Sequence, residues 1–262
     1  MRAASIACIA AAAAVALGLL LPSMVAQAFD PNALWKIVSG QCVPNQLAHG
    51  DPKPCVEVDL KDGAERGYAV LKDLHGATQY LLIPTQRIVG IESPELLAPN
   101  AANYFADAWN ARGFVEKALG HALPIDALGL AVNSKLARTQ NQLHVHIDCV
   151  RPDVHATLNK LRAGIGDTWA PLAEPVGGYP YWAMRVMGPT LAEQNPFKLL
   201  VQGVPGARAD MQLRTLVVAG MRFEGDAPGF VILQDRADLV HLNFGAGARL
   251  LDHDCALGRD KG

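Results

Sequence analysis

Residues 142–150 constrain the fold of this chain more than any other part of the sequence. Apolar side chains stand at its odd positions up to 147, and the even positions are polar: Gln142, His144, His146 and Asp148. Successive side chains of a β-strand point to opposite faces of the sheet, so this alternation predicts a strand with one buried and one polar face. We therefore expect a sheet whose polar face carries two histidines, with Cα atoms roughly 6 to 7 Å apart.

The segments before this strand predict an α+β fold built on an antiparallel sheet. Residues 68–71 and 79–83 are strand-like and are joined by a short polar turn, which is typical of a β-hairpin. Residues 100–119 carry apolar side chains at helical spacing and predict one long helix packed across the sheet. We also expect a short helix over residues 30–41, ending near Gly40, and a strand over residues 128–133.

The segments after the polar strand follow a similar order. The patterns predict a helix over 154–163, a strand over 181–186, a helix over 195–204, and strands over 213–219 and 230–234. No second His-x-His motif occurs in this stretch. The C-terminal half therefore either completes the sheet or repeats the same architecture in degenerate form.

The N-terminus carries the pattern of an export signal. Met1 and Arg2 precede an apolar run over residues 3–21, which is followed by the small-residue triplet Ala26-Gln27-Ala28. We expect cleavage after Ala28. The alternative is that the run remains as a membrane anchor, because its length is just sufficient to cross a bilayer. The protein is then periplasmic, or it is tethered to the outer face of the cytoplasmic membrane.

The mature chain is expected to form one domain. Removal of residues 1–28 from the 262 leaves 234, which suits a single domain over residues 29–262 with a catalytic half, 29–165, and a C-terminal half, 166–262. Its formal charge is 22 minus 25, or −3, because Arg2 is the only charged residue lost. Nucleic-acid binding depends on positive charge, so we expect no nucleic-acid partner.

Four cysteines remain after Cys8 is removed with the signal, an even number in an oxidising compartment, and this predicts two disulfides. Cys42 and Cys55 flank a Pro/Gly-rich stretch that we do not expect to hold its own shape, and a bridge there contributes about 3 kcal/mol in the chain-entropy model. Cys149 and Cys255 would then tie the C-terminal tail to the middle of the chain. No C-x-x-C spacing occurs, which argues against zinc thiolate or thioredoxin-like chemistry.

Two histidines on one strand face can bind a metal, carry out phosphoryl chemistry or simply be solvated. Asp148 continues the face and would complete a His-His-Asp metal site, but three ligands in a straight row converge poorly on one tetrahedral ion. The sequence has no P-loop, no G-x-S-x-G and no G-x-G-x-x-G motif. Five further histidines lie in turns, near helix ends or in the tail and are expected to be structural or solvated: His49, His75, His121, His155 and His253.

The neighbouring sequence distinguishes between these alternatives. Residues 142–148, Gln-Leu-His-Val-His-Ile-Asp, resemble the histidine-triad motif, and residues 80–87 and 132–134 resemble the strands that precede it in that superfamily. The closer resemblance is to the CDP-diacylglycerol pyrophosphatase family. It covers most of residues 34–170 and is carried by these segments: 36–38, 42–46, 54–55, 68–74, 79–85, 133–134, 138–141 and 149–154, with later matches at 196–197 and 252–255.

This resemblance implies a fold, an activity and a set of site residues. The fold is a histidine-triad-like antiparallel sheet, and the activity is hydrolysis of the pyrophosphate bond of CDP-diacylglycerol to CMP and phosphatidate, next to a membrane surface. His144 aligns with the nucleophile that forms a nucleotidyl-histidine intermediate, and His146 with the residue that contacts the phosphate and assists proton transfer. Neutral imidazole is a good nucleophile and leaves readily, and the mechanism requires no metal or other cofactor.

The chain departs from the superfamily pattern at Gln142, which stands where the first histidine of the triad normally lies. An amide can partly replace the hydrogen bond by which that histidine orients the nucleophile. We expect Arg87 to hold phosphate oxygens, and the polar residues Asn133, Thr139, Gln140 and Asn141 to bind nucleotide or phosphate.

Two other functions stay open at this point. One is nucleotidyl transfer, or hydrolysis of soluble nucleotides, on the same scaffold; the other is an exported, non-catalytic metal-binding protein. The oligomeric state also stays open, because many histidine-triad proteins dimerise to complete their core and a duplicated C-terminal half makes a dimer unnecessary.

Overall fold

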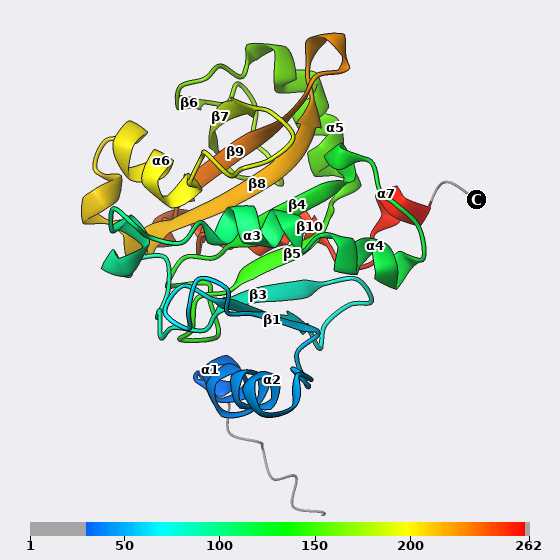
Figure 1. The fold of residues 1–262 in the computed structure, drawn as a ribbon. Helices are drawn as coiled ribbons and strands as arrows, with labels where there is room; N and C mark the ends of the chain where they lie inside the picture. The colour runs from blue at the N-terminus through cyan, green and yellow to red at the C-terminus, as the bar shows by residue number, and fades with distance from the viewer. Residues whose placement is uncertain (1–29, 260–262) are drawn as a thin grey trace, which may run out of the picture.

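The computed structural model describes residues 30–259, so the expected export signal, residues 1–28, lies outside the described residues. These residues form an α+β fold around one antiparallel sheet (Figure 1). Nine strands follow the order β1-β2-β3-β5-β4-β8-β9-β7-β6, and β10 pairs with the end of β5. The strands are β1 (Glu57–Asp59), β2 (Tyr68–Lys72), β3 (Tyr80–Pro84), β4 (Leu128–Val132), β5 (Val145–Val150), β6 (Ala170–Pro171), β7 (Trp182–Met187), β8 (Arg214–Arg222), β9 (Pro228–Arg236) and β10 (Leu251–Asp252).

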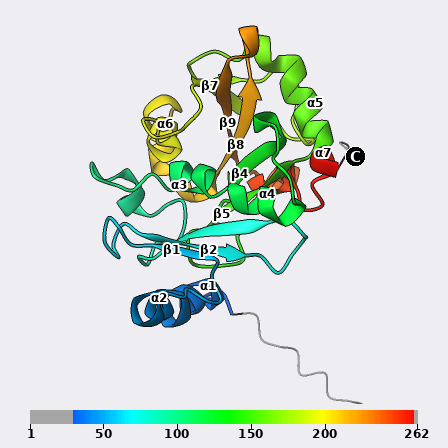
Figure 2. The ribbon, with the colours of Figure 1, turned by 45° about the vertical axis from the view of Figure 1, so that its right-hand side comes forward.

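Helices cover both faces of the sheet (Figure 2). They are α1 (Ala33–Ile37), α2 (Val43–His49), α3 (Tyr104–Asn110), α4 (Gly113–Leu119), α5 (Pro152–Leu161), α6 (Pro196–Gly203) and α7 (Ala256–Arg259). A π-helical turn, η1 (Val38–Cys42), joins α1 to α2.

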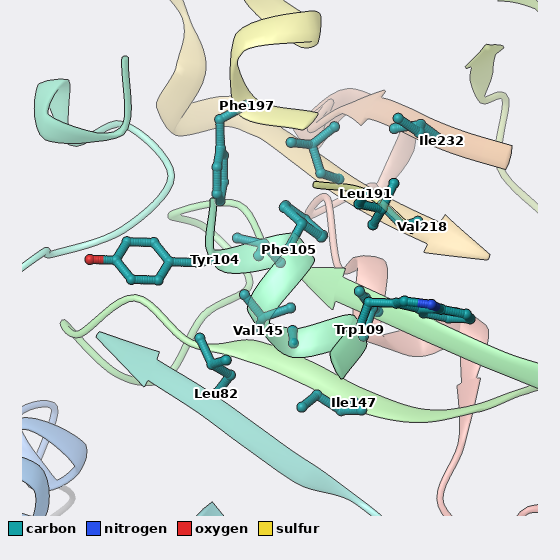
Figure 3. Close-up of a cluster of buried hydrophobic side chains, with 14 of the residues drawn as sticks. Leu82, Tyr104, Phe105, Trp109, Val145, Ile147, Leu191, Phe197, Val218 and Ile232 are labelled. Carbon is teal, nitrogen blue, oxygen red and sulfur yellow. The ribbon is translucent and has the colours of Figure 1, made fainter. Parts of the chain in front are cut away.

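The largest core lies where α3 and α6 pack on one face. Phe105 of α3 and Phe197 of α6 are fully buried with ring centroids 5.0 Å apart, and Figure 3 shows them among apolar side chains of the central strands. Val145 and Ile147, the odd positions of β5, belong to this core. The even positions of β5 therefore face the other side of the sheet.

That other side is covered in two separate places. The α1–η1 segment packs on β2 and β3 through Leu34 and Val38, and α5 packs on β4, β8 and β9 through Val154 and Leu158. The histidine strand β5 lies between these two covered regions in the order of the strands. A gap is therefore left over the polar face of the sheet.

Most of the expected elements are confirmed. Strands β2 and β3 pair antiparallel as the predicted hairpin, β4 lies where residues 128–133 indicated it, and the C-terminal helices and strands α5, β7, α6, β8 and β9 follow in the expected order. Both predicted disulfides are present, Cys42–Cys55 and Cys149–Cys255. No helix within residues 30–259 is both long and apolar enough to cross a membrane.

The single long helix expected over residues 100–119 is wrong. The segment forms two short helices, α3 and α4, which meet at Ala111, Arg112 and Gly113. The Arg112 guanidinium donates a 2.7 Å hydrogen bond to the carbonyl oxygen of Trp109, which satisfies one of the last carbonyls of α3. Gly113, a poor helix former, begins the second helix.

Two further boundaries differ from expectation. The N-terminal helical stretch does not end near Gly40 but continues through η1 and α2 to His49, and Gly50 ends the helix with a φ of 65°. The polar strand begins at Val145 rather than at residue 142. Before it the chain is held by irregular contacts, such as the 2.6 Å hydrogen bond from Leu143 N to Ile88 O.

Candidate active site

A cavity of about 700 Å³ opens over the polar face of β5. Its walls come from α1, from the end of β2 and the turn after it, from the loop that follows β4, and from the C-terminal segment. The lining residues used below are Leu74, Lys72, Asp73, His75, Asn133, Thr139, Gln140, His144, His146 and His253. Both histidines of the His-x-His motif therefore face one enclosed space.

His144 is held in the geometry of a nucleophile. Its Nδ1 lies 2.8 Å from the main-chain oxygen of Gln142, a carbonyl that can only accept, so Nδ1 carries the proton and Nε2 keeps a free lone pair. Burial lowers the pKa of His144 below its ordinary value of 6.5, which keeps the ring neutral at neutral pH. A neutral, fixed imidazole with a free Nε2 is suited to attack phosphorus.

His146 stands next to His144 on the same face. The two rings meet edge to face with centroids 4.9 Å apart, and Asn133 Nδ2 lies 3.5 Å from His146 Nε2. The Asn133 side chain is itself fixed, because its Oδ1 accepts a 3.0 Å hydrogen bond from Ala248 N. Burial, and next the neighbouring His144, hold the pKa of His146 well below 6.5. Among the described residues, nothing hydrogen-bonds the buried Nδ1 of His146.

Gln142 orients His144 through its main chain and not through its side chain. The fully buried amide donates from Nε2 to the carbonyl oxygens of Pro84 and Gln86, at 3.0 and 2.9 Å. These bonds fix the strand entry to the end of β3, and so fix the carbonyl that holds His144. The Gln142 side chain thus acts on His144 indirectly, by fixing the Gln142 carbonyl that the His144 ring contacts.

The expected substrate-binding residues divide into two groups. Asn133, Thr139 and Gln140 line the cavity, and Gln140 also joins α1 to the site by accepting from Leu34 N and donating to Asp30 O, both at 3.1 Å. Arg87 and Asn141 are not among the lining residues within the described part of the chain.

Arg87 and Asn141 instead support the α1 segment. The Arg87 guanidinium donates to Asn32 and lies over the Trp35 ring, 5.4 Å from its centroid. Asn141 donates its main-chain N–H to Pro31 O at 2.6 Å. Both residues fix the helix that forms one wall of the cavity.

Four titratable side chains line the cavity but were not predicted from the sequence to belong to the site: Lys72, Asp73, His75 and His253. The Lys72 ammonium donates to the main-chain oxygens of Asp73 and Gly76, both at 2.9 Å. Burial alone would raise the pKa of Asp73, but hydrogen bonds from His75 and Gln79 outweigh it and lower that pKa. Asp73 and His75 lie in the hairpin turn after the predicted strand, which was a usable signal because turns at the end of a strand border its face, whereas His253 belongs to the distant C-terminal segment.

Asp148 does not complete a His-His-Asp metal face. Its carboxylate is fully buried and is held by Thr78 Oγ1 at 2.7 Å, by Cys149 N at 2.9 Å and by His253 Nδ1 at 2.8 Å. Within residues 30–259 no group of three or more histidine, cysteine, aspartate or glutamate side chains is arranged to hold a metal ion.

Comparison with known proteins agrees with the resemblance seen in the sequence. A family model described as CDP-diacylglycerol pyrophosphatase matches residues 29–259, almost all of the chain that follows the expected signal. The chain belongs to this family. A curated relative, the CDP-diacylglycerol pyrophosphatase of Yersinia pestis, is 41% identical over 226 residues, which cover 86% of this chain and 84% of that protein.

Proposed function

We propose that this chain hydrolyses the pyrophosphate bond of CDP-diacylglycerol to CMP and phosphatidate, with His144 as the nucleophile. The observation that carries the proposal is the fixed His144 ring, whose Nδ1 is held by the Gln142 carbonyl while the ring lines the cavity. Family membership over residues 29–259 and the curated Yersinia pestis relative supply the substrate.

The reaction divides into two displacements. Nε2 of His144 attacks the phosphorus attached to the nucleoside, the bond from that phosphorus to the bridging oxygen breaks, and phosphatidate leaves. Water then attacks the nucleotidyl-histidine and CMP leaves. His146 and the Lys72 ammonium line the same cavity and stabilise the negative oxygens of the diphosphate.

We also propose that residues 29–262 form one histidine-triad-like domain whose C-terminal half, 166–262, is a degenerate repeat of the catalytic half, 29–165. The support is the strand order, β2-β3-β5-β4 in one half and β8-β9-β7-β6 in the other. Outward from the β4–β8 pair, the strands are β4, β5, β3 and β2 in one half and β8, β9, β7 and β6 in the other. Each series is the third, fourth, second and first of its four strands in chain order, and helices lie between the second and third strands. A single chain then builds the sheet that two protomers would otherwise share.

The repeat assigns the chemistry to one half only. In the catalytic half β4 pairs with β5 at Ala131 and His146, and in the other half β8 pairs with β9 at Val217 and Leu233. Ala131, Val217 and Leu233 belong to one core on the same side of the sheet. Leu233 thus occupies the position that corresponds to His146, and the second half contributes core where the first contributes a site.

The proposed substrate is a lipid, so the active site works beside a bilayer. A tail loop next to the Asn133 segment exposes apolar side chains: Leu239, Val240, Leu242 and Phe244, with Val240 87% and Leu242 71% accessible. Ser134 Oγ donates to Phe244 O, which places the loop beside the cavity wall. Leu74, which lines the cavity, is also exposed. Exposed apolar groups in such a cluster are typical of a membrane-contacting surface.

Vesicle binding tests this surface. The variant Val240→Ser with Leu242→Ser should lose binding to phospholipid vesicles while it keeps turnover of substrate dispersed in detergent, because it leaves the cavity untouched. Unchanged vesicle binding would remove the loop from the proposal.

The two disulfides fit a protein that is exported to an oxidising compartment. We propose that the mature protein is periplasmic or is tethered to the outer face of the cytoplasmic membrane.

Release of CMP from CDP-diacylglycerol in detergent, with EDTA present, tests the function. The mature chain should release CMP, and His144→Ala should lose release by about 10³-fold or more while it keeps its fold. No release by the folded wild-type chain would contradict the proposal. Faster turnover of soluble nucleotide diphosphates, or CMP transfer to an added alcohol in preference to water, would favour the alternative reactions on the same site.

A further inference from the structure

His253, on the C-terminal segment, lines the cavity and is held by a buried carboxylate. Its Nδ1 lies 2.8 Å from Asp148 Oδ2, and Asp148 is fully buried while 40% of the His253 side chain stays accessible. The hydrogen bond occupies Nδ1, so the opposite nitrogen, Nε2, is left for the cavity that His253 lines. A histidine oriented by a buried carboxylate is the arrangement that general bases use.

The main chain at residue 253 is fixed as tightly as the side chain. Strand β10 pairs with the end of β5 through Asp252 and Cys149, and Ala77 N donates to His253 O at 3.1 Å. Gly76 touches His253 so closely that a Cβ at residue 76 would collide with the histidine's own Cβ. Only two residues further on, the Cys149–Cys255 disulfide binds the tail to the residue next to Asp148.

His253 and His144 stand at opposite ends of one row. Along the polar face of β5 the order is His144, His146 and Asp148, and His253 extends from the Asp148 end. His144 stands one residue before β5; the four residue steps from 144 to 148 span at most roughly 13 Å between Cα atoms, and His146 lies between them. A phosphate held at His146 would therefore have His144 on one side and His253 on the other, as an in-line displacement needs.

We propose that His253 is a third catalytic residue, which activates the water that cleaves the nucleotidyl-His144 intermediate, and that Asp148 is its positioning residue. This assignment rests on the proposed hydrolase function and deepens it. The hydrogen bond that His253 Nδ1 donates to Asp148 raises the pKa of His253 above 6.5, while the nearby carboxylates Asp73 and Asp252 act in the same direction. His253 acts on His146 in turn, and the pKa of His146 is held low, first by burial.

The proton balance closes over one turnover. His253 begins protonated; as His144 Nε2 bonds to phosphorus, the bond to the bridging oxygen breaks and the departing phosphatidate oxygen takes the proton from His253. Neutral His253 then removes a proton from water as the water oxygen bonds to phosphorus. The bond from phosphorus to Nε2 breaks with its electron pair, so His144 returns neutral, CMP leaves and His253 is again protonated.

The two displacements respond differently to the loss of His253. Phosphatidate is a phosphate monoester and departs without a strong acid, whereas water needs a base to attack. His253→Gln and His253→Ala should therefore still release phosphatidate in a burst close to one per enzyme. CMP release should fall about 10² to 10⁴-fold, the range of general-base catalysis, and the nucleotidyl-histidine should accumulate.

The measurement is rapid-quench kinetics on the mature chain with CDP-diacylglycerol, following phosphatidate, CMP and the protein-bound nucleotide separately. His155→Ala is the matched control, because His155 also bonds a carboxylate, Asp126 at 3.0 Å, and lies outside the cavity lining. Asp148→Asn should show the same accumulation to a smaller extent. A purely structural effect would reduce both releases together without accumulation.

Accumulation of the intermediate in His253→Gln, with an unchanged burst, supports the assignment. Unchanged CMP release, or equal loss of phosphatidate and CMP release with no trapped intermediate in both His253 variants, overturns it. Absence of any CMP release by the wild-type chain would instead overturn the proposed function itself, and this assignment with it.

Discussion

Strands β5 and β9 occupy corresponding places in the two halves of the sheet but have opposite characters. On the side of the sheet away from α3, β5 and the residue before it carry His146, Asp148 and His144, whereas β9 carries the buried apolar residues Val231 and Leu233. The α1–η1 segment leaves the β5 face open, while α5 and the C-terminal segment close over the β9 face. The two halves share one strand arrangement, and the side chains at a few corresponding positions, such as His146 and Leu233, determine which half carries the site.

The variants His146→Ala and Leu233→Ala, at corresponding positions, should show the largest difference in effect between the two halves. His146→Ala should lower the rate of phosphatidate release by about 10² to 10³-fold, because it removes a group that stabilises the phosphate, with little change in stability. Leu233→Ala should lower the free energy of unfolding by about 2 to 5 kcal/mol and keep the rate per folded molecule. Rapid-quench kinetics and urea titration measure the two effects. Equal losses of rate in both variants would contradict the assignment of the site to one half.

Loss of the Cys42–Cys55 disulfide should affect the catalytic half alone. Changing both cysteines to serine removes a cross-link of 13 residues and should cost about 3 kcal/mol in the chain-entropy model. Because the bridge anchors η1, which continues the cavity wall formed by α1, KM should rise several-fold while kcat changes less. Steady-state kinetics below the unfolding temperature test this. A selective fall in kcat with KM unchanged would argue against a role in shaping the cavity.

Gln142→Ala should act through the strand entry rather than through the imidazole. It removes two buried hydrogen bonds to carbonyl oxygens and should cost about 1 to 3 kcal/mol of stability. The His144 Nδ1 bond goes to a main-chain oxygen and survives the change, so we expect phosphatidate release to fall by less than about tenfold. Thermal unfolding and burst kinetics of the same preparation measure both. A loss as large as that of His144→Ala would show that the amide itself acts in catalysis.

The pH dependence should show the smallest effect. A histidine of ordinary pKa 6.5 is about three-quarters protonated at pH 6. Burial lowers the pKa of His144, so a smaller fraction of the ring is protonated at pH 6 and the burst rate should fall by clearly less than about fourfold between pH 7.5 and 6. A fourfold fall with an apparent pKa near 6.5 would contradict the burial argument.

The lowered pKa values of His144 and His146 also predict that the fold is less stable in acid. Their folded pKa values lie below 6.5, so the unfolded chain binds protons that the folded chain does not. Their contribution to stability is complete above pH 6.5 and is lost as the pH falls through that value. The midpoint of urea unfolding should decrease from pH 7 to pH 5, and less so in His146→Ala.

Local pattern was sufficient to predict much of this molecule. Strand alternation placed His144 and His146 on one face, and composition and spacing predicted the hairpin, the order of the C-terminal elements and both disulfides. These features depend on residues close in sequence, or, for the cysteines, on pairing within a small set. The break between α3 and α4 was not predictable from apolar periodicity, because the periodicity continues through Ala111 while Arg112 and Gly113 end the helix.

Apart from the Cys149–Cys255 disulfide, contacts between distant segments could not be predicted from the sequence. His253 lies 105 residues from Asp148, and nothing local to either residue indicates their hydrogen bond. Arg87, which we expected from the sequence to hold phosphate, packs on Trp35 outside the cavity lining, and no local pattern indicates that contact. The disulfide Cys149–Cys255 was the one available signal, since it implies that residues 148 and 253 are neighbours.

The most direct test of the account is to locate the covalent intermediate. The mature chain, and His253→Gln if turnover is too fast, would be quenched in alkali with CDP-diacylglycerol, digested and analysed by mass spectrometry. The account predicts a CMP adduct on His144 and none in His144→Ala. An adduct on His146 or on another residue, or rapid formation of CMP with no adduct in either protein, would contradict it.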